Sequence, residues 1–551
     1  MKHVFRLLPG VLALTAGISA CTNDNNNTDN VSQVKNVVVI YAENRAFDNT
    51  FGNFPGAHGL GDVVDSTGKP TAAYVPQKDR DGSTVLATLP QTWGGVTAAG
   101  VTPAVTQAQS AGLANAPFSV ESGFTAASGA TLDSNTTTRD LYHRFFENQM
   151  EINGGKNDMF AAWADAGGLT MGHFDTSNSK LYGLAQKYVL ADNFFEGAFG
   201  GSFLNHQYLI CACAPEYPNA DTAAAKPSIA VVDKDSSGSY LTRLTLASSS
   251  PASALDGPPK FVLSGAIAPA NYFGDGKFYG INTMQAPYQP SGNAPADASG
   301  TDLLYADASK GSTMPPQTAS NIGDLLTAKN VSWKWYGGSW NAAVTDGTQD
   351  PSKPRTVIYT PSTARAAPDF QPHHQPFNYY KEFDPGTTAG AAARAAHLKD
   401  YTDLVADAKA GTLPAVAFYK PQGNLNQHEG YANLADGDAH IADLVSQLQA
   451  SPQWSNMLIV ITYDEFGGVW DHVAPPKGDK LGPGTRIPAI IISPLSKKNG
   501  TVDHTQYDTA SILRFITHRF SLDTLPGLAA RDSALKTNGA QPMGDLSNAL
   551  Q

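Results

Sequence analysis

Short apolar runs bounded by polar and turn-forming segments mark the strands that this chain is expected to form. Val37–Tyr41, Ala415–Tyr419, Met457–Thr462 and Ile487–Ile492 are rich in branched and aromatic residues and show no polar alternation. Runs of this kind are typical of strands buried on both faces, as in parallel sheets covered by helices. The pattern therefore predicts a buried sheet whose first strand lies far from the others in sequence.

Helical spacing alternates with these strands in the C-terminal part of the chain. Residues 397–410 are predicted to form a helix that ends at Gly411. A second helix is predicted to begin with Asp438 as its N-cap, and a third to span residues 508–520. In the second helix, apolar residues recur at i, i+3, i+4 and i+7: Ile441, Leu444, Val445 and Leu448. Such alternation predicts an α/β fold with a largely parallel sheet and helices on both faces.

The remaining segments are predicted to be loops and insertions around one large domain that spans residues 35–525. Residues 61–135 are rich in Thr, Ala, Ser and Gly and predict an extended surface excursion. Residues 216–320 are turn-rich and predict an insertion or cap, and residues 526–551 are expected to form a C-terminal tail after the last helix. Between the two loop-rich stretches, helical spacing places three aromatic residues on one face: Tyr142, Phe145 and Phe146.

The N-terminus has the pattern of an export signal. Lys2 and Arg6 precede the apolar run Leu7–Leu14, which is short for a membrane span. Ile18-Ser19-Ala20-Cys21 resembles a bacterial lipobox, so residues 1–20 are interpreted as a lipoprotein signal peptide and Cys21 as the lipidated residue. Residues 21–34 are then a disordered tether, and Thr22 after the cysteine resembles lipoproteins sent to the outer membrane. The alternative is ordinary cleavage and release from the cell.

Composition narrows the classes of function. The 551 residues carry a formal net charge of −12, which argues against nucleic acid as the main partner. Besides Cys21, the chain has Cys211 and Cys213, one residue apart. A pair this close bridges only with strain, so two buried thiols are expected.

Acidic and amide side chains come directly after two of the predicted strands. Asp464 and Glu465 end the Met457–Thr462 run, and Glu43 and Asn44 come after Val37–Tyr41. Because the carboxyl ends of parallel strands meet at one edge of a sheet, these four residues are expected to converge. An oxygen-only set suits one hard divalent cation such as Mg²⁺, Ca²⁺ or Mn²⁺. Taken alone, either pair could equally be solvated acids in a surface turn.

A serine and several histidines supply candidate chemistry. Gly200 and Gly201 before Ser202 would allow a tight turn that leaves the hydroxyl open at a helix start. Serine needs a base or a cation to attack, and Gly-Gly-Ser is also a common loop sequence, so these residues alone favour a structural role. The consecutive pair His373 and His374 would be stabilised by an anionic ligand, or would simply lie in a polar loop.

Several motifs in order resemble the bacterial phosphoesterase family that contains acid phosphatase A and the phospholipases C, within the alkaline-phosphatase-like superfamily. The motifs are Glu43-Asn44-Arg45-Ala46-Phe47-Asp48, Asn153-Gly154-Gly155, the block at 200–205, Tyr463-Asp464-Glu465-Phe466-Gly467-Gly468 and Asp471-His472-Val473. The resemblance covers roughly residues 35–520 and implies an alkaline-phosphatase-like three-layer sandwich.

The resemblance also implies roles for individual residues. Ser202 corresponds to the metal-bound nucleophile that forms a phosphoryl-enzyme, and Glu43, Asn44, Asp464 and Glu465 correspond to the other metal ligands. Four histidines correspond to those lining the phosphate pocket of the acid phosphatase branch: His143, His373, His374 and His428. Of these, His143 and His428 correspond to catalytic residues as well. His143 could instead be an ordinary packing residue on an aromatic helix.

Departures from the phospholipase pattern favour the acid phosphatase branch. Phospholipases C of this family typically show Gly-Pro-Thr followed by Pro-Asn-Arg, where this chain has Gly201, Ser202, Leu204 and His206. The chain also ends soon after the last predicted helix, without the extra domains common in those enzymes. We therefore expect a metal-dependent acid phosphatase acting on small phosphate monoesters. Phospholipase C activity is the alternative, and an inactive surface lipoprotein that binds phosphate-bearing ligands comes third. Histidines with an ordinary pKa of about 6.5 would favour acidic pH.

Overall fold

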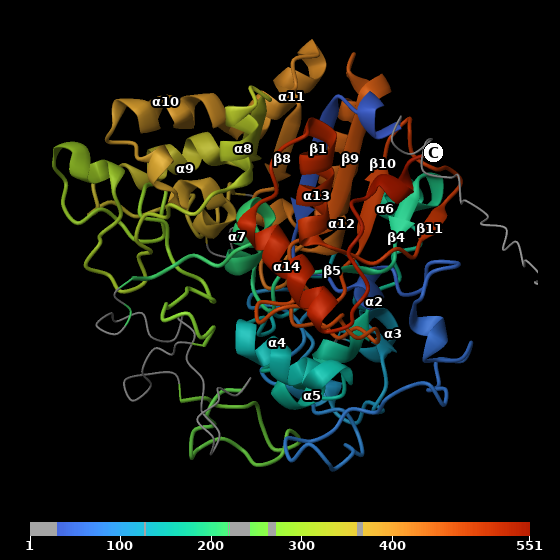
Figure 1. Cartoon of the computed structure of the whole chain (residues 1–551). Coiled ribbons are helices and arrows are strands. Elements are labelled where there is room, and N and C mark those ends of the chain that lie inside the picture. Colours follow the sequence, from blue (N-terminus) through green and yellow to red (C-terminus); the bar gives the residue numbers. More distant parts are fainter. Residues whose placement is uncertain (1–29, 126–127, 219, 221–242, 263–271, 361–366) are drawn as a thin grey trace, which may run out of the picture.

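The core of the protein is a mixed β-sheet, seen in a computed structural model that describes residues 30–125, 128–218, 220, 243–262, 272–360 and 367–551 (Figure 1). Within those residues the sheet has eight strands in the order β11-β4-β10-β9-β1-β8-β6-β7. Their bounds are β1 Asn36–Ala42, β4 Val189–Ala191, β6 Trp333–Gly337, β7 Leu398–Asp400, β8 Val416–Lys420, β9 Met457–Tyr463, β10 Ala489–Ile492 and β11 Thr501–Asp503. Short strands β2 Phe118–Ser119 and β3 Gly172–His173 form one separate pair, and β5 Phe194–Phe195 and β12 Tyr507–Asp508 another.

Most of the sheet is parallel, as the apolar runs predict. Strand β1 lies at its centre and pairs in parallel with both β8 and β9, and every residue of β1 is buried. The run at 487–492 is a strand, but it runs antiparallel to both of its neighbours, β9 and β4. The sequence shows that this run is buried and does not show its direction.

Helices cover both faces of the sheet, which confirms the predicted three-layer α/β arrangement. On one face, Tyr41 of β1 donates to the Asn205 carbonyl oxygen in α7, against which α13 and α14 pack; α13 lies in front of β1 in Figure 1. On the other face, Tyr419 of β8 hydrogen-bonds His440 of α12, which packs against α6 and α11. The α-helices are α2 Phe47–Thr50, α3 Val120–Gly123, α4 Phe145–Ile152, α5 Phe160–Trp163, α6 Lys180–Lys187, α7 Ser202–Cys211, α8 Ile322–Ala328, α9 Trp340–Gly347, α10 Thr388–His397, α11 Tyr401–Ala410, α12 Leu434–Gln449, α13 Thr509–Phe520 and α14 Pro526–Thr537.

Several predicted helix boundaries need correction. The segment 397–410 contains the end of α10, strand β7 and then α11, which ends at Gly411 in the left-handed region as predicted. Helix α12 begins four residues before Asp438, with Asn433 as its N-cap. Asp438 is instead a partner of another helix, because its carboxylate accepts hydrogen bonds from the backbone N–H groups of Lys180 and Leu181 at the start of α6.

The two ends of the predicted domain are more ordered than expected. Val31 and Val34, in the stretch interpreted as a tether, are buried in the main core. Residues 526–551 are not a simple tail, because α14 buries Leu528 and Leu535 and forms one more helix after α13. Helix α4 begins at Phe145, so Tyr142 precedes it.

The loop-rich segments are packed against the domain. Residues in the range 60–132 contribute to two small apolar clusters, so this segment is not an extended excursion. The described parts of 216–320 are mainly turns, with one 3-10 helix, Gly300–Leu304, as an insertion predicts. Among the described residues, no helix is both long and apolar enough to cross a membrane. The predicted signal peptide and Cys21 lie outside the described residues.

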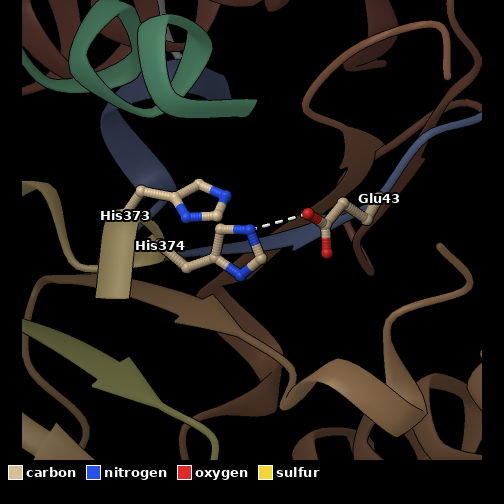
Figure 2. Close-up of side chains that lie close together, drawn as sticks. All are labelled: Glu43, His373 and His374. Carbon is tan, nitrogen blue, oxygen red and sulfur yellow. Dashed lines mark ion pairs between the residues drawn. The ribbon is translucent and has the colours of Figure 1, made fainter. Parts of the chain in front are cut away.

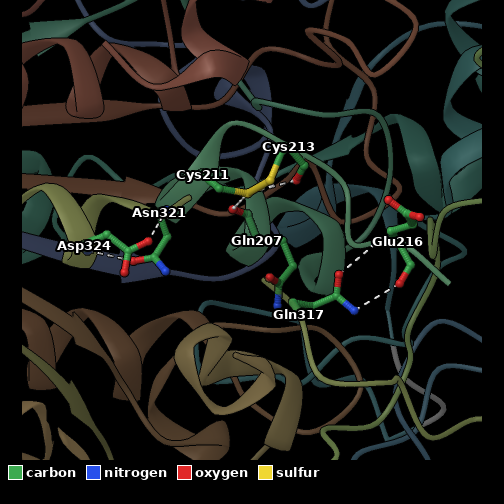
Figure 3. Close-up of a disulfide and its surroundings, with 7 residues drawn as sticks. All are labelled: Gln207, Cys211, Cys213, Glu216, Gln317, Asn321 and Asp324. Atoms are coloured by element: carbon green, nitrogen blue, oxygen red, sulfur yellow. Dashed lines mark hydrogen bonds between the residues drawn. A yellow bond between two sulfur atoms is a disulfide. The ribbon is translucent and has the colours of Figure 1, made fainter. Parts of the chain in front are cut away.

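Cys211 and Cys213 form a disulfide, which corrects the expectation of two free thiols (Figure 3). Helix α7 ends at Cys211, and Ala212 adopts a left-handed conformation with φ of 50°. This reversal of the backbone brings the two Cα atoms to 5.1 Å, which lies within the ordinary range for a disulfide. The helix end, which the sequence does not reveal, makes the pairing possible.

Candidate active site at the carboxyl edge of the sheet

Three adjacent strands deliver charged side chains to one place. Ala42 at the end of β1 is in register with Tyr463 at the end of β9, so Glu43-Asn44 and Asp464-Glu465 continue side by side. The backbone N–H of Asn44 donates to Oδ1 of Asp464 at 3.2 Å. Glu43, Asn44, Asp464 and Glu465 are fully buried. The structure thus brings together the four residues predicted from the strand ends.

Ser202 lies directly above these residues as the first residue of α7. Its Oγ is 3.1 Å from Oε1 of Glu465, 3.2 Å from Oε1 of Glu43 and 3.5 Å from Oδ1 of Asn44. Gly200 permits this approach, because its φ is +85° and a Cβ there would lie 2.3 Å from the backbone nitrogen of Phe145. The hydroxyl therefore faces a cluster of buried carboxylates.

A second glycine shapes the acidic side of the site. Gly467 has a φ of +68°, and a Cβ on it would lie 2.5 Å from the Asn44 carbonyl oxygen. Asn44 itself has a φ of 63°, a conformation that asparagine tolerates better than most residues. The two loops can be this close only because position 467 has no side chain.

Lys420 is a member of the site that the sequence reasoning missed. It ends β8 on the other side of β1, and its Nζ lies 3.5 Å from Oδ2 of Asp464 and 3.7 Å from Oε2 of Glu43. Its side chain is only 2% exposed. The signal was available, because Lys420 ends an apolar strand just as Glu43 and Asp464 come after theirs.

His373 and His374 reach the site from a separate loop, as Figure 2 shows. Nε2 of His374 lies 2.6 Å from Oε1 of Glu43, and the two histidine rings are 4.3 Å apart. Burial lowers the pKa of His374 to about 4, although Glu43 opposes the change. Burial and the neighbouring His374 likewise hold the pKa of His373 well below its ordinary value.

His143 and His428 form a second pair of histidines, beside Glu465. Nδ1 of His143 contacts the Leu141 carbonyl oxygen at 2.6 Å, which places the proton on Nδ1 and leaves Nε2 facing Oε1 of Glu465 at 3.5 Å. The His428 ring lies 5.3 Å from that of His143. Burial lowers the pKa of His143 to about 4 and also lowers that of His428. The ordinary value of about 6.5, from which acidic activity was predicted, therefore does not apply to these histidines.

His206 is a second residue that sequence reasoning missed. One helical turn after Ser202, its Nδ1 lies 2.7 Å from the Ser202 carbonyl oxygen and 3.7 Å from Oδ2 of Asp464. Its ring stacks on that of His374 at 4.7 Å, and its Nε2 has no hydrogen-bond partner among the described residues. The i, i+4 spacing from Ser202 on a helix could have indicated this contact.

The buried carboxylates carry more negative charge than their protein neighbours balance. Burial raises the pKa of Glu43, but His374 and Lys420 outweigh it and hold the pKa well below its usual range. Burial, opposed by Lys420 and assisted by Glu43, raises the pKa of Asp464 to about 7. Burial and the adjacent Asp464 raise the pKa of Glu465 well above its usual range. Acids packed this closely fit a cation at the same place.

Histidine side chains come close to the predicted oxygen donors. Ligand atoms of Glu43, His373 and His374 lie within 4.8 Å of one another, and so do those of His206, His374 and Asp464. Imidazole nitrogen therefore lies beside the predicted oxygen donors. The residues fit a divalent cation, and this mixed set also suits transition metals.

Comparison with known proteins assigns this chain to a family. A model of the phosphoesterase family matches residues 34–523, and the chain belongs to this family. It is 30% identical over 178 residues to a non-hemolytic phospholipase C of Burkholderia pseudomallei, an alignment that covers 26% of this chain and 25% of that protein. It is 30% identical over 159 residues to phospholipase C B of Mycobacterium tuberculosis, covering 24% and 30%.

A plant relative is similar to the same extent. Non-specific phospholipase C6 of Arabidopsis thaliana is 30% identical over 149 residues, covering 21% of this chain and 28% of the plant protein. The matched segments thus span less than a third of each of these three relatives. All three of these relatives are named as phospholipases C.

Similarity to solved structures is weak. A protein of the alkaline phosphatase superfamily from Vibrio parahaemolyticus has a TM-score of 0.22 and 10% identity, covering 48% of this chain and 58% of that one. The structure of Ps i-CgsB has a TM-score of 0.28 and 12% identity, covering 67% and 69%. The fold assignment therefore rests on the order and direction of the strands.

Proposed function

We propose that this protein hydrolyses phosphodiesters of the phospholipid head-group type, with Ser202 as the nucleophile. The observation that carries this proposal is the position of the Ser202 hydroxyl at the start of α7, 3.1–3.5 Å from Glu465, Glu43 and Asn44. The first N–H groups of a helix have no partner within the helix, so the start of α7 suits a phosphoryl oxygen.

The protein's own residues supply a route for the proton. Glu465 accepts a hydrogen bond from Ser202, and His143 Nε2 lies 3.5 Å from the same carboxylate oxygen. The serine proton passes through Glu465 to His143, the oxygen attacks phosphorus, and His143 donates the proton to the departing alcohol. Water then attacks the phosphoserine with His143 as the base, and the serine is regenerated.

Five residues would hold a divalent cation: Glu43, Asn44, Ser202, Asp464 and Glu465. A bound cation would lower the pKa of the serine hydroxyl and stabilise negative charge on the phosphoryl oxygens. Lys420 complements it by neutralising the carboxylate oxygens on the side away from Ser202. Metal analysis of the purified protein would determine whether the ion is Mg²⁺, Ca²⁺, Mn²⁺ or a transition metal.

Charge balance supports a diester over a monoester. A bound divalent cation would favour the ionised form of Glu43, Asp464 and Glu465. Together with the ammonium group of Lys420, the cation would then bring the formal charge of these groups to zero. The lowered pKa values of His143 and His374 leave both rings neutral at pH 7. A diester brings one negative charge to this buried site, whereas a monoester brings up to two, with a larger electrostatic cost.

Phosphate monoesters are the second candidate substrates. Four histidines lie around the site, and a ring that is protonated on both nitrogens donates an N–H to the additional free oxygen that a monoester has. This arrangement is what the sequence resemblance to the acid phosphatase branch predicts.

Turnover of p-nitrophenyl phosphorylcholine and of p-nitrophenyl phosphate separates the two candidates. Ser202→Ala is expected to lose at least about a thousandfold in kcat on the preferred substrate while keeping its fold. Ser455→Ala is a matched control, because Ser455 is exposed just before the amino end of β9, at the other end of that strand from the site. Near-wild-type activity of Ser202→Ala would refute the nucleophile. If the native chain turns over neither substrate, a ligand-binding lipoprotein is favoured instead.

We further propose that the protein is an exported lipoprotein of the bacterial cell envelope, anchored through Cys21. The lipobox pattern supports this proposal. Metabolic labelling with palmitate, compared between the native chain and Cys21→Ser, tests it, because the variant should lose the label.

A further inference from the structure

A second group of metal-binding side chains lies farther along the same edge of the sheet. Strand β4 ends at Ala191 and is followed by Asp192, and β11 ends at Asp503 and is followed by His504. These two strands are parallel neighbours, with Asp503 in register with Ala191. Because β10 runs antiparallel to both β9 and β4, the ends of β4 and β9 lie at one edge. That edge carries the candidate active site at β8, β1 and β9, and this second group at β4 and β11.

His58 completes the second group from the loop that comes after α2. One ligand atom from each of His58, Asp192 and His504 lies within 4.8 Å of the other two. Nδ1 of His504 is 2.8 Å from Oδ2 and 3.0 Å from Oδ1 of Asp192, and the two imidazole rings are 4.9 Å apart. Asp192 is fully buried, whereas His58 and His504 are 62% and 52% exposed. A fixed carboxylate therefore lies beneath two imidazoles that an ion can reach from solvent.

We propose that His58, Asp192 and His504 form a binding site for a divalent transition metal such as Zn²⁺, separate from the candidate active site. Two imidazole nitrogens and one carboxylate oxygen are donors that suit Zn²⁺, Ni²⁺ or Cu²⁺ better than Mg²⁺ or Ca²⁺. Ligands about 2.0 Å from a tetrahedral ion lie roughly 3.3 Å apart. The His504–Asp192 separation is a few tenths of an ångström shorter, so small side-chain movements would admit the ion in place of the shared proton.

Surrounding contacts hold the three ligands in position. The backbone N–H of His58 donates to Oδ2 of Asp192 at 2.8 Å, which fixes the carboxylate relative to the loop. Oδ2 of Asp62 lies 3.4 Å from Nδ1 of His58, where it favours a proton on Nδ1. Nε2 of His58 is then the nitrogen that binds the metal ion. Arg486 donates to the carbonyl oxygens of both His58 and Asp192, at 2.7 and 2.8 Å. The loop after α2 is thus already tied to the sheet edge, and little ordering is left to oppose binding.

An ordinary histidine–carboxylate hydrogen bond is the competing explanation for part of this geometry. His518 and Asp545 form such a pair elsewhere on the surface, with Nδ1 2.7 Å from Oδ2. Among the described residues, no group of three potential metal ligands includes His518 or Asp545. His518→Ala is therefore a matched control, since it removes a similarly exposed histidine from a similar pair.

Bound Zn²⁺ would join three chain segments that are distant in sequence. Because the loop carrying His58 continues from α2 and the Glu43-Asn44 segment, occupancy should stabilise the whole edge. An ion that binds only the folded state raises Tm as its concentration increases.

Counting bound ions tests the site without measuring activity. The full-length protein is stripped with chelator, equilibrated with Zn²⁺, separated from free ion and analysed for metal by mass spectrometry. The native chain and His518→Ala are expected to hold one Zn²⁺ more per chain than either His58→Ala or His504→Ala, and only the first two should show the larger rise in Tm with Zn²⁺. Circular dichroism checks that each variant is folded.

Equal Zn²⁺ content and equal Tm response in all four proteins would overturn the proposal. A second measurement needs no variant: crystals soaked with Zn²⁺ should give an anomalous peak between the three side chains. No peak there at saturating Zn²⁺ would also overturn it. Neither result depends on Ser202, so the proposed hydrolase function stands or falls separately.

Discussion

Replacing Lys420 with methionine tests the electrostatic account of the candidate active site most directly. Methionine keeps most of the length of the side chain and removes its charge. At separations of 3.5 and 3.7 Å, each carboxylate attracts the ammonium by roughly 4–5 kcal/mol at an effective dielectric constant of about 20. The cost of burying Lys420 offsets much of this attraction, so the net loss expected on removing one partner of a buried pair is about 3–5 kcal/mol. For a chain of this size that corresponds to a fall in Tm of roughly 3–5 °C.

The assay is thermal unfolding of Lys420→Met and native protein, in chelator and with saturating divalent cation. The cation supplies the missing positive charge, so the Tm deficit should shrink when it is present. Lys334→Met is the control, because its pair with Asp407 at 2.6 Å is about one-fifth to one-quarter exposed and should contribute less than about 1 kcal/mol. A deficit that is the same in both conditions, or no larger than that of Lys334→Met, would refute the reasoning.

Other contacts lead to three further predictions. Gly467→Ala places a methyl group 2.5 Å from the Asn44 carbonyl oxygen in a left-handed conformation, so kcat and Tm should both fall, and an unchanged kcat would contradict the proposed packing. The Cys211–Cys213 disulfide closes a very short loop, so its effect on the entropy of the unfolded chain stabilises the fold by less than about 2 kcal/mol. Reducing the disulfide should therefore lower Tm by no more than about 2 °C, and a larger fall would contradict this. Burial lowers the pKa of His472, but Asp48 at 2.6 Å outweighs burial, and the net pKa is raised. The His472–Asp48 pair therefore stabilises the fold most below pH about 6.5, and this stabilisation is lost as pH rises through the raised pKa. The Tm difference between native protein and His472→Gln should therefore shrink between pH 6 and 9, and a difference that grows with pH would reverse the sign.

The sequence by itself determined which segments are buried strands and which side chains lie at their ends. Apolar runs identify strands β1, β8, β9 and β10 because a strand covered on both faces tolerates no polar alternation. Charged residues directly after such runs must lie at a sheet edge, so Glu43 and Asp464 could be predicted to meet although they lie far apart in the chain. Lys420 also lies at the end of an apolar strand, so its position in the site could have been predicted in the same way.

The tertiary structure alone decided direction, partnership and charge state. The antiparallel direction of β10 depends on how the segments before and after it cross the sheet. An apolar run in the sequence does not indicate the direction of its strand. Asp438 is a residue type that often caps a helix, yet it caps the neighbouring helix α6 and not the helix α12 that contains it. A hydrogen bond depends on distance and not on sequence position. The pKa values of His143 and His374 are set by burial among neighbours from other segments. Local sequence fixes which groups can titrate or bind, and only packing fixes what surrounds them.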